Sequence, residues 1–162
     1  MKHYYPAIFR PKGEPLKGYD IRVPDVAGCL TTGDDIGECM EMAQDALGVM
    51  FEGVAEKDYP APAQAVDIDL SEYPAGSFVS YVCFDKEAYD ERVKQNERAA
   101  ILNAENPIRE LLNRRRMKIK ELADMLEMPY RTLQDNALGK SKMPAWVLKL
   151  VVDKVLNTSS NA

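Results

Sequence analysis

Residues 18–35 read GYDIRVPDVAGCLTTGDD, and this stretch decides how the first half of the chain folds. Apolar and polar side chains alternate over residues 19–23, which is the period of a strand with one buried face. Pro24 ends that strand because proline has no N–H to donate to a sheet ladder. A second short strand is predicted over residues 29–32, and Asp35 stands where its carboxylate can cap a helix that begins at the next residue.

The flanking segments complete a small unit of sheet and helix. Residues 4–9 form a first strand, and Pro6 within it predicts a place at the edge of the sheet. Apolar residues recur at three- and four-residue intervals over residues 36–54, as in a helix with one buried face. A long loop rich in proline follows over residues 57–76. Residues 77–84 are then apolar on both faces, which predicts a central strand.

The stretch over residues 18–35, with YYPAIF before it and the predicted helix after it, resembles the HicB family of antitoxins, which partner the HicA messenger-RNA-cleaving toxins. The family pattern is roughly G-Y-x-V-x-x-P-D-x-P-G-C-x-T-x-G-D, and this chain departs from it mainly at Ala27, where a second proline is common. The resemblance implies a β-β-β-α-β unit like a partial RNase H fold, used for binding rather than hydrolysis. It also implies that a HicA-like toxin docks on the exposed side of the sheet and the neighbouring loops.

Composition narrows the possible functions. The chain has 162 residues, of which 29% are charged and 46% apolar, and no apolar run approaches the roughly 20 residues of a membrane span. No signal-peptide core follows the N-terminus, so a cytoplasmic protein is expected. Cys29, Cys39 and Cys83 show no C-x-x-C spacing and are expected to be core residues, and His3 is the only histidine. We therefore expect neither a metal nor a cofactor, and no histidine-based catalytic site.

The two halves of the chain carry opposite charge. Residues 1–90 contain 7 Lys and Arg against 17 Asp and Glu, whereas residues 91–162 contain 14 against 9. This division predicts a basic protein partner for the acidic half and nucleic acid for the basic half. Ordinary solvated surfaces are the alternative.

The second half begins with a helical linker and continues with a compact helical motif. Residues 86–104 are polar and predict a linker helix that could also help the chain to dimerise. Asn106 and Pro107 supply a cap and a proline at the start of the next helix. Residues 118–140, KIKELADMLEMPYRTLQDNALGK, resemble the helix-turn-helix of the Cro and phage-repressor class. In that resemblance the small Ala123 is the point at which the second helix approaches the first.

Three positions depart from this class. Glu127 stands where the turn commonly has glycine, and it would need a left-handed backbone at a cost of roughly 1 kcal/mol. Lys118 stands where Ser or Thr usually caps the first helix, and Asn136 where tryptophan is frequent. A further amphipathic helix follows over residues 145–151, as is typical of the class, and Trp146 is predicted to lie in its core.

If the second helix of the motif enters the major groove, its outward side chains contact bases. Arg131 suits a guanine edge and Gln134 an adenine edge, and a dimer that reads two half-sites is expected. A helical protein-interaction module with a basic rim is the alternative. The residues expected to contact bases are Tyr130, Arg131, Thr132, Gln134 and Asp135, and those expected to contact phosphates are Lys140, Lys142, Arg114, Arg115 and Arg116.

The sequence predicts a binding protein rather than an enzyme. Asp20 is the only candidate carboxylate that lies within a predicted strand, and one carboxylate does not hold two catalytic metal ions. A magnesium-dependent RNA-cleaving enzyme, which would lose its activity on Asp20→Asn, is the least favoured alternative.

These observations define an expected α+β architecture and function. The predicted parts are a HicB-like toxin-binding domain over residues 1–85, a linker helix over 86–104, an all-α helix-turn-helix domain over 105–157 and a flexible tail over 158–162. The expected function is that of a type II antitoxin that neutralises a HicA-type mRNA interferase and represses its own operon, as a homodimer or higher homo-oligomer on operator DNA. The alternative is a stand-alone or prophage helix-turn-helix regulator whose N-terminal domain serves dimerisation or ligand sensing.

Overall fold

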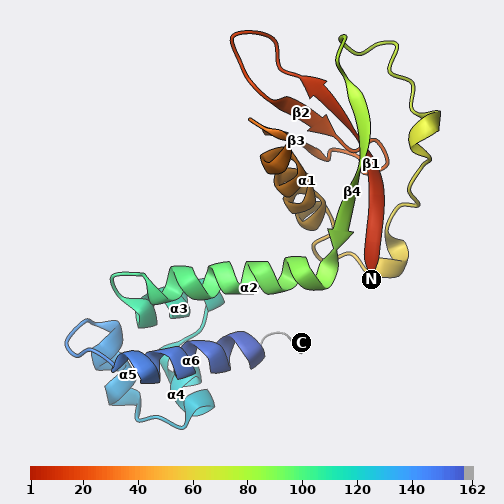
Figure 1. The fold of residues 1–162 in the computed structure, drawn as a ribbon. Coiled ribbons are helices and arrows are strands. Elements are labelled where there is room, and N and C mark those ends of the chain that lie inside the picture. Colours follow the sequence, from red (N-terminus) through yellow and green to blue (C-terminus); the bar gives the residue numbers. More distant parts are fainter. Residues whose placement is uncertain (159–162) are drawn as a thin grey trace. The chain divides into compact units, whose positions relative to one another are not determined.

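The computed structural model describes residues 1–158, which form two compact units, each with its own hydrophobic core (Figure 1). The first unit is Met1–Asp90 and the second begins at Glu91. The predicted tail begins at Thr158, which is still the last residue of a helix, and its remaining residues 159–162 lie outside the described residues. Within the described part, the chain contains four strands and six α-helices, which confirms a mixed α+β class.

The first unit is built on a four-stranded antiparallel sheet with the strand order β3-β2-β1-β4. The predicted places of two strands are wrong, because the first strand is interior and the last one, predicted to be central, lies at the edge. The strands are β1 (Lys2–Pro11), β2 (Tyr19–Arg22), β3 (Leu30–Gly33) and β4 (Phe78–Asp85).

Strand β1 tolerates Pro6 although it is an interior strand, because its two neighbouring strands pair with different parts of it. Strand β4 pairs with β1 from Lys2 to Phe9, whereas β2 pairs with it only from Ile8 to Pro11. Pro6 therefore lies at a level that β2 does not reach, and its missing N–H removes no hydrogen bond to that strand.

Strand β4 is apolar on both faces although it lies at the edge, because the loop between α1 and β4 covers its outward face. This loop contains two short 3-10 turns, η1 (Glu56–Asp58) and η2 (Ala65–Asp67). The N–H of Ala65 donates to the hydroxyl of Tyr81 on β4, with 3.1 Å between the two atoms. The part of the loop around Ala65 and helix α1 thus lie on opposite faces of the sheet, whereas Tyr59, earlier in the loop, packs against the core on the α1 side (Figure 1).

Helix α1 (Ile36–Met50) covers the inner face of the sheet. Its predicted cap is confirmed, since the Asp35 carboxylate accepts the N–H of Glu38 at 2.9 Å. The buried stretch of α1 is shorter than its apolar pattern indicated, because Ile36 and Met50 at the two ends of the helix are 43% and 38% exposed. Its fully buried members are Cys39, Ala43 and Leu47.

The second unit is all-helical, and its core consists of aliphatic side chains, mostly Leu, Ile and Val. Trp146 was predicted to lie in this core and is instead 68% exposed. It precedes the buried Val155 by nine residues, which at 100° per residue places the two on opposite sides of one helix. The helices are α2 (Lys86–Leu102), which begins in the first unit, α3 (Pro107–Arg115), α4 (Ile119–Leu126), α5 (Tyr130–Ala137) and α6 (Ala145–Thr158).

Candidate functional sites

Helices α4 and α5 pack against each other through a short turn. Leu122 on α4 and Leu133 on α5 have no exposed surface, and the small Ala123 is 5% exposed. Glu127 occupies the turn with φ 55° and ψ 37°, so the predicted left-handed residue is confirmed. The next residue, Met128, donates its N–H to the carbonyl of Ala123 at 3.0 Å, which closes the end of α4.

The residues that precede the two helices are Lys118 and Pro129. Pro129 is the residue immediately before α5 and has φ −59°. Lys118 precedes α4 and its ammonium group cannot accept a hydrogen bond. The carboxylate of Glu121 instead accepts the Lys118 N–H at 2.7 Å, so one half of a capping box replaces the missing Ser or Thr.

Two asparagines, Asn106 and Asn136, fix the C-terminal end of α5. The sequence predicted only a capping role for Asn106. Asn136 is 8% exposed and its side-chain N–H donates to the carbonyl of Thr132 at 2.7 Å. Asn106 caps α3 by accepting the N–H of Arg109 at 3.0 Å. The same Asn106 side chain donates to the carbonyls of Asn136 and Ala137 at 3.2 and 3.0 Å, so it also ties the start of α3 to the end of α5.

The structure brings most of the predicted DNA-binding residues onto α5 and the loop that follows it. Leu133 points into the core, while Gln134 and Asp135 are half-buried. The carbonyl of Asp135 accepts the N–H of Lys140 at 2.8 Å, and this bond turns the loop back onto the helix. The exposed members of the predicted set in this region are Tyr130, Arg131, Thr132, Lys140 and Lys142.

Two of the three arginines at the end of α3 that were predicted to contact phosphates are already in ion pairs within the second unit. Arg114 pairs with Glu110 and Arg115 with Glu97, each at 2.6 Å. The Arg115 side chain is only 23% exposed, so much of its guanidinium is already engaged within the unit. Arg116 is exposed and has the left-handed φ of 50° that ends α3.

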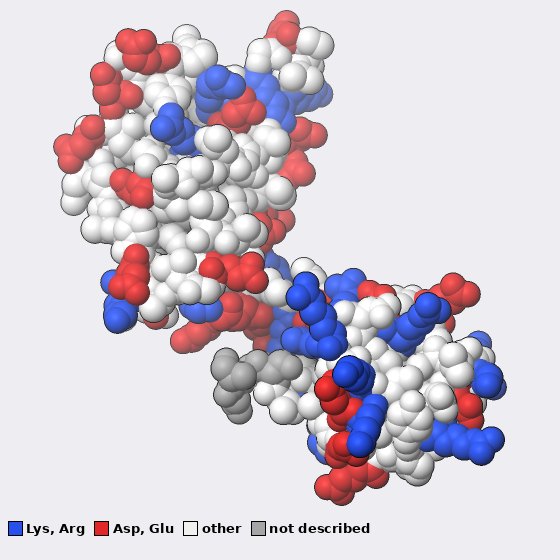
Figure 2. Space-filling model, turned by 180° about the vertical axis from the view of Figure 1, so that it is seen from behind, with Lys and Arg blue, Asp and Glu red and all other residues white. Residues whose placement is uncertain are grey.

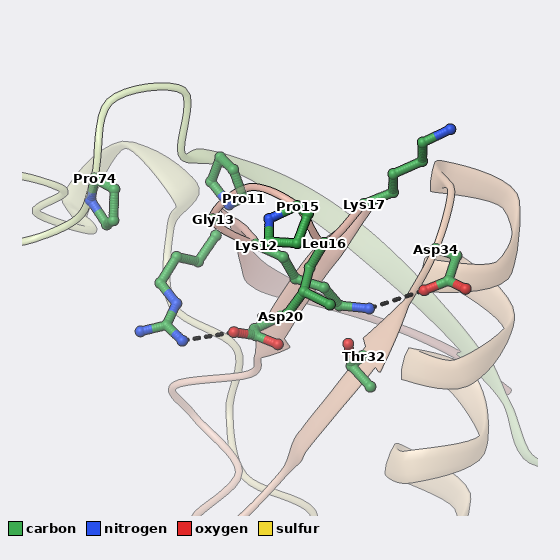
Figure 3. Close-up of a pocket in the computed structure, with 11 residues that line it drawn as sticks. Pro11, Lys12, Gly13, Pro15, Leu16, Lys17, Asp20, Thr32, Asp34 and Pro74 are labelled. Atoms are coloured by element: carbon green, nitrogen blue, oxygen red, sulfur yellow. Dashed lines mark hydrogen bonds and ion pairs between the residues drawn. The ribbon is translucent and has the colours of Figure 1, made fainter.

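A hollow of about 820 Å³ lies at one end of the sheet in the first unit, and the candidate carboxylate Asp20 is among the residues that line it (Figure 3). Arg10 on β1 lies directly opposite Asp20 on β2, and their side chains form an ion pair at 2.5 Å. The hydrogen bond from Arg10 holds the pKa of Asp20 below its ordinary value. Beside it Lys12 pairs with Asp34 at 3.0 Å. Within residues 1–158 no group of three or more His, Cys, Asp or Glu side chains is placed to hold a metal ion.

The outer face of the sheet is divided into a covered part and an open part. Under the loop, Ile8 is 3% exposed. Towards β3, the neighbours in register Arg22 and Leu30 are exposed, and Leu30 is 66% exposed. The open part carries Arg10, Arg22 and Asp20 and is therefore mixed in charge.

The cysteines behave largely as the sequence predicted. Cys29 and Cys39 are buried in the first core, and Cys83 is half-buried. Burial raises the pKa of the Cys29 thiol to about 11, so the thiolate that reacts and binds metals is disfavoured there.

Both units carry charges of both signs on the face shown in Figure 2. On the first unit, Asp and Glu lie mostly along the margins and Lys and Arg gather near one end, and on the second unit Lys and Arg are spread among Asp and Glu. Among the described residues no helix is long and apolar enough to cross a membrane.

Three comparisons with known proteins place this chain among its relatives. Residues 5–97, more than half of the chain, match the model of the family described as HicB_like antitoxin of bacterial toxin-antitoxin system. A segment of 45 residues is 42% identical to an uncharacterised 14.9 kDa protein from the rep-hol intergenic region of Haemophilus phage HP1, and it covers 28% of this chain and 34% of the phage protein. The match thus spans about a third of that relative. A chain of a solved toxin-antitoxin complex from Streptococcus pneumoniae shares 19% identity with a TM-score of 0.47, over 88% of this chain and 100% of the other.

Proposed function

Because this chain belongs to the HicB-like antitoxins of bacterial toxin-antitoxin systems, we propose that its first unit binds and neutralises a HicA-type mRNA-cleaving toxin in the cytoplasm. The observation that carries this proposal is the family match over residues 5–97, which includes β1 from Tyr5 onward, the other three strands, helix α1 and the loop between α1 and β4. The charge of residues 1–90, with 7 basic against 17 acidic residues, supports a basic partner. The element order β1-β2-β3-α1-β4 supports a partial RNase H-like unit, and in this proposal the unit serves binding rather than hydrolysis.

The second unit is the proposed operator-binding part, with α4 and α5 as a helix-turn-helix. Its support is the tight turn at Glu127, which packs the two short helices together, and the exposure of Arg131 on α5. In this proposal α5 enters the major groove, where Arg131 and Gln134 contact bases. Lys140 and Lys142 contact phosphates, and two copies of the chain read two half-sites as a homodimer. The protein thereby represses its own operon.

A prophage regulator without a toxin is the second candidate. The similarity to a protein of phage HP1 favours it, because that relative is encoded in a phage genome. In this case the first unit would serve dimerisation or ligand sensing.

Co-expression separates these candidates. The untagged chain is produced together with the protein of the adjoining reading frame, and the purified material is analysed by size-exclusion chromatography and mass spectrometry. A stable complex with a small basic protein is expected. Recovery of the chain without any such partner, together with intact operator binding, would instead favour the plain regulator.

Operator binding is tested by gel shift at about 0.05 M and about 0.2 M salt, between which several phosphate contacts weaken affinity by orders of magnitude. Arg131→Ala/Gln134→Ala is expected to abolish the retarded band. Lys154→Ala, which removes an exposed cation on α6, serves as the matched control and should retain it. An unchanged shift in the double variant would contradict the assignment of α5 to the major groove.

A further inference from the structure

The start of α6 carries two large apolar side chains on its solvent-facing side. Trp146 is 68% exposed and Leu150 is 61% exposed. They are four residues apart, so they lie one turn apart on the same side of the helix. Asp153 and Asn157 continue this row, because seven and eleven residues are close to two and three turns of a helix.

Helix α2 contacts only the later part of this row. Arg98 donates to the carboxylate of Asp153 at 3.1 Å, and Lys94 donates to the side chain of Asn157. A step of four residues forward along α2 is thus a step of four residues backward along α6, so the two helices are antiparallel. Because α2 ends four residues after Arg98, it stops about one turn of α6 short of Trp146, which explains why that ring is exposed.

A groove of about 640 Å³ lies beside these side chains in the second unit. It is lined by Ala145, the residue before Trp146, so the projecting ring and the groove are neighbours on one surface. A cavity of about 150 Å³ holds a benzene ring, so this groove has room for an indole. The groove is formed by the start of α3, the end of α5, the following loop and the start of α6, and its larger apolar residues include Ile108, Leu138, Met143 and Leu148.

A projecting side chain and a groove on one surface let two copies of the chain complement each other about a two-fold axis, since each copy supplies both parts. Trp146 and Leu150 together expose on the order of 300 Å². Two such patches packed on each other would bury roughly 600 Å², which is the size of a crystal contact. Insertion into the other copy's groove also buries the groove walls, and the total of roughly 1,200 Å² reaches the range of stable interfaces.

The charges around the groove disfavour the other occupants. Glu105, Arg109 and Lys142 line the groove and are exposed, and the exposed Lys149 lies beside them on α6. A basic protein would therefore meet three cations and one acid. The phosphates of a nucleic acid would bind the cations, but they would neither fill the apolar groove nor cover the indole ring.

We propose that the chain forms a two-fold dimer in which Trp146 of each copy inserts into the groove between α3 and α6 of the other copy. The inference rests on the proposed function and names the contact of the homodimer that reads two half-sites. The exposed Arg131 on α5 does not line the groove and stays available to DNA. Lys142 can line the groove with its methylene stem while its ammonium group reaches a phosphate.

Sedimentation equilibrium of the full chain without DNA measures the dissociation constant of the dimer and tests the inference. Trp146→Ala removes the inserted ring, whereas Ala145→Glu places a charged side chain in the groove and keeps the ring. Val93→Ala removes methyl groups at a 46% exposed position on α2 outside the groove and serves as the control. All three residues are exposed, so the variants are expected to fold, and circular dichroism checks this.

Trp146→Ala and Ala145→Glu are each expected to weaken dimerisation about 100-fold or more, because an inserted tryptophan commonly dominates an interface. Val93→Ala should stay within about 3-fold of the unmodified chain. An equimolar mixture of the two groove variants is the sharpest test, since one copy supplies the ring and the other the open groove. One of the two contacts then forms, and the mixed dimer should associate about 10-fold more tightly than either variant alone.

Two results would overturn the inference and leave a homodimer standing. One is unchanged dimerisation of Trp146→Ala, and the other is a mixture that associates no better than its separate components. If the unmodified chain stays monomeric at about 100 µM, the homodimer of the proposed function fails and the inference fails with it. Toxin binding by the first unit is measured separately by co-expression and does not depend on this result.

Discussion

The two units stabilise their cores by different means. In the first unit, aromatic rings from distant parts of the chain meet, as when Phe9 stacks on Phe78 with ring centroids 4.9 Å apart and Phe51 meets Phe84 edge-on at 5.3 Å. In the second unit, short helices bring Leu, Ile and Val together, and polar caps such as Asn106 fix their ends. The first unit thus depends on a few large, long-range contacts, whereas the second depends on many local ones.

Removal of one ring should therefore have the largest effect. Phe9→Ala leaves a cavity beside Phe78 and is expected to destabilise the first unit by about 3–5 kcal/mol. Differential scanning calorimetry of the full chain should show the loss in one transition, with the other unchanged. Val49→Ala, at an exposed position, serves as a control and should change stability by less than about 0.5 kcal/mol. Equal loss in both transitions would contradict the independence of the two cores.

Removal of Asn106, which caps α3 and also binds α5, tests the local polar contacts of the second unit. Asn106→Ala loses the cap of α3, worth about 1 kcal/mol, and two hydrogen bonds to α5 worth about 1 kcal/mol each, so the second unit should lose about 2–3 kcal/mol. Asn106→Ser keeps the cap and should lose less. Denaturant unfolding measures both variants, with the exposed Asn103→Ala as control. An equal loss for Ser and Ala would show that the bonds to the carbonyls of α5 contribute nothing.

The left-handed turn predicts a gain in stability. Glu127 has φ 55°, which costs a residue with a side chain roughly 1 kcal/mol. Glu127→Gly relieves that strain, but the greater chain entropy of glycine offsets about 0.4–1 kcal/mol of it, so the second unit should be stabilised by at most about 0.6 kcal/mol. Lys120→Gly, within α4, should instead destabilise it by about 1 kcal/mol. Thermal unfolding measures both, and destabilisation by Glu127→Gly would show that the turn depends on this side chain.

The exposed ion pair at the end of the sheet should have the smallest effect. Folding lowers the pKa of Asp20 below its ordinary value of 3.8 because Arg10 donates a hydrogen bond to the carboxylate. Such a group stabilises the fold above pH 3.8, and the contribution is lost as pH falls through the lowered pKa of the folded state.

Asp20→Asn should therefore cost about 0.5 kcal/mol at neutral pH, because both side chains are partly exposed and screened. The difference from the unmodified chain should vanish at the acid end of a pH series of urea unfolding curves. A difference that persists at acid pH would assign the effect to something other than the charge of Asp20.

Local signals in the sequence were sufficient for the caps and turns. The caps at Asp35 and Asn106 and the left-handed Glu127 each depend on residues within a few positions, and each was predictable from the sequence. On α5 the agreement is partial: of the side chains predicted to face outward, Tyr130, Arg131 and Thr132 are exposed, whereas Gln134 and Asp135 are half-buried.

The order of the strands and the exposure of Trp146 depend on distant parts of the chain. Pro6 predicted that β1 would be an edge strand. The interior strand β1 can contain this proline because β2 is short and does not pair with β1 at Pro6. The apolar outer side of β4 indicated a central strand, whereas β4 is an edge strand whose outer face is covered by the loop. The inward register of α6 is set by Val152 and Val155, which contact helices far away in sequence.

Trp146 gives the molecule an intrinsic optical reporter. It is the only tryptophan of the chain, lies at the start of α6 in the second unit and is 68% exposed. Selective excitation of its indole ring therefore follows the second unit alone, without a label. Solvent contact should place its emission at long wavelength and leave it open to quenching by acrylamide, so any macromolecule that covers the start of α6 should shift the emission to the blue and shield the ring.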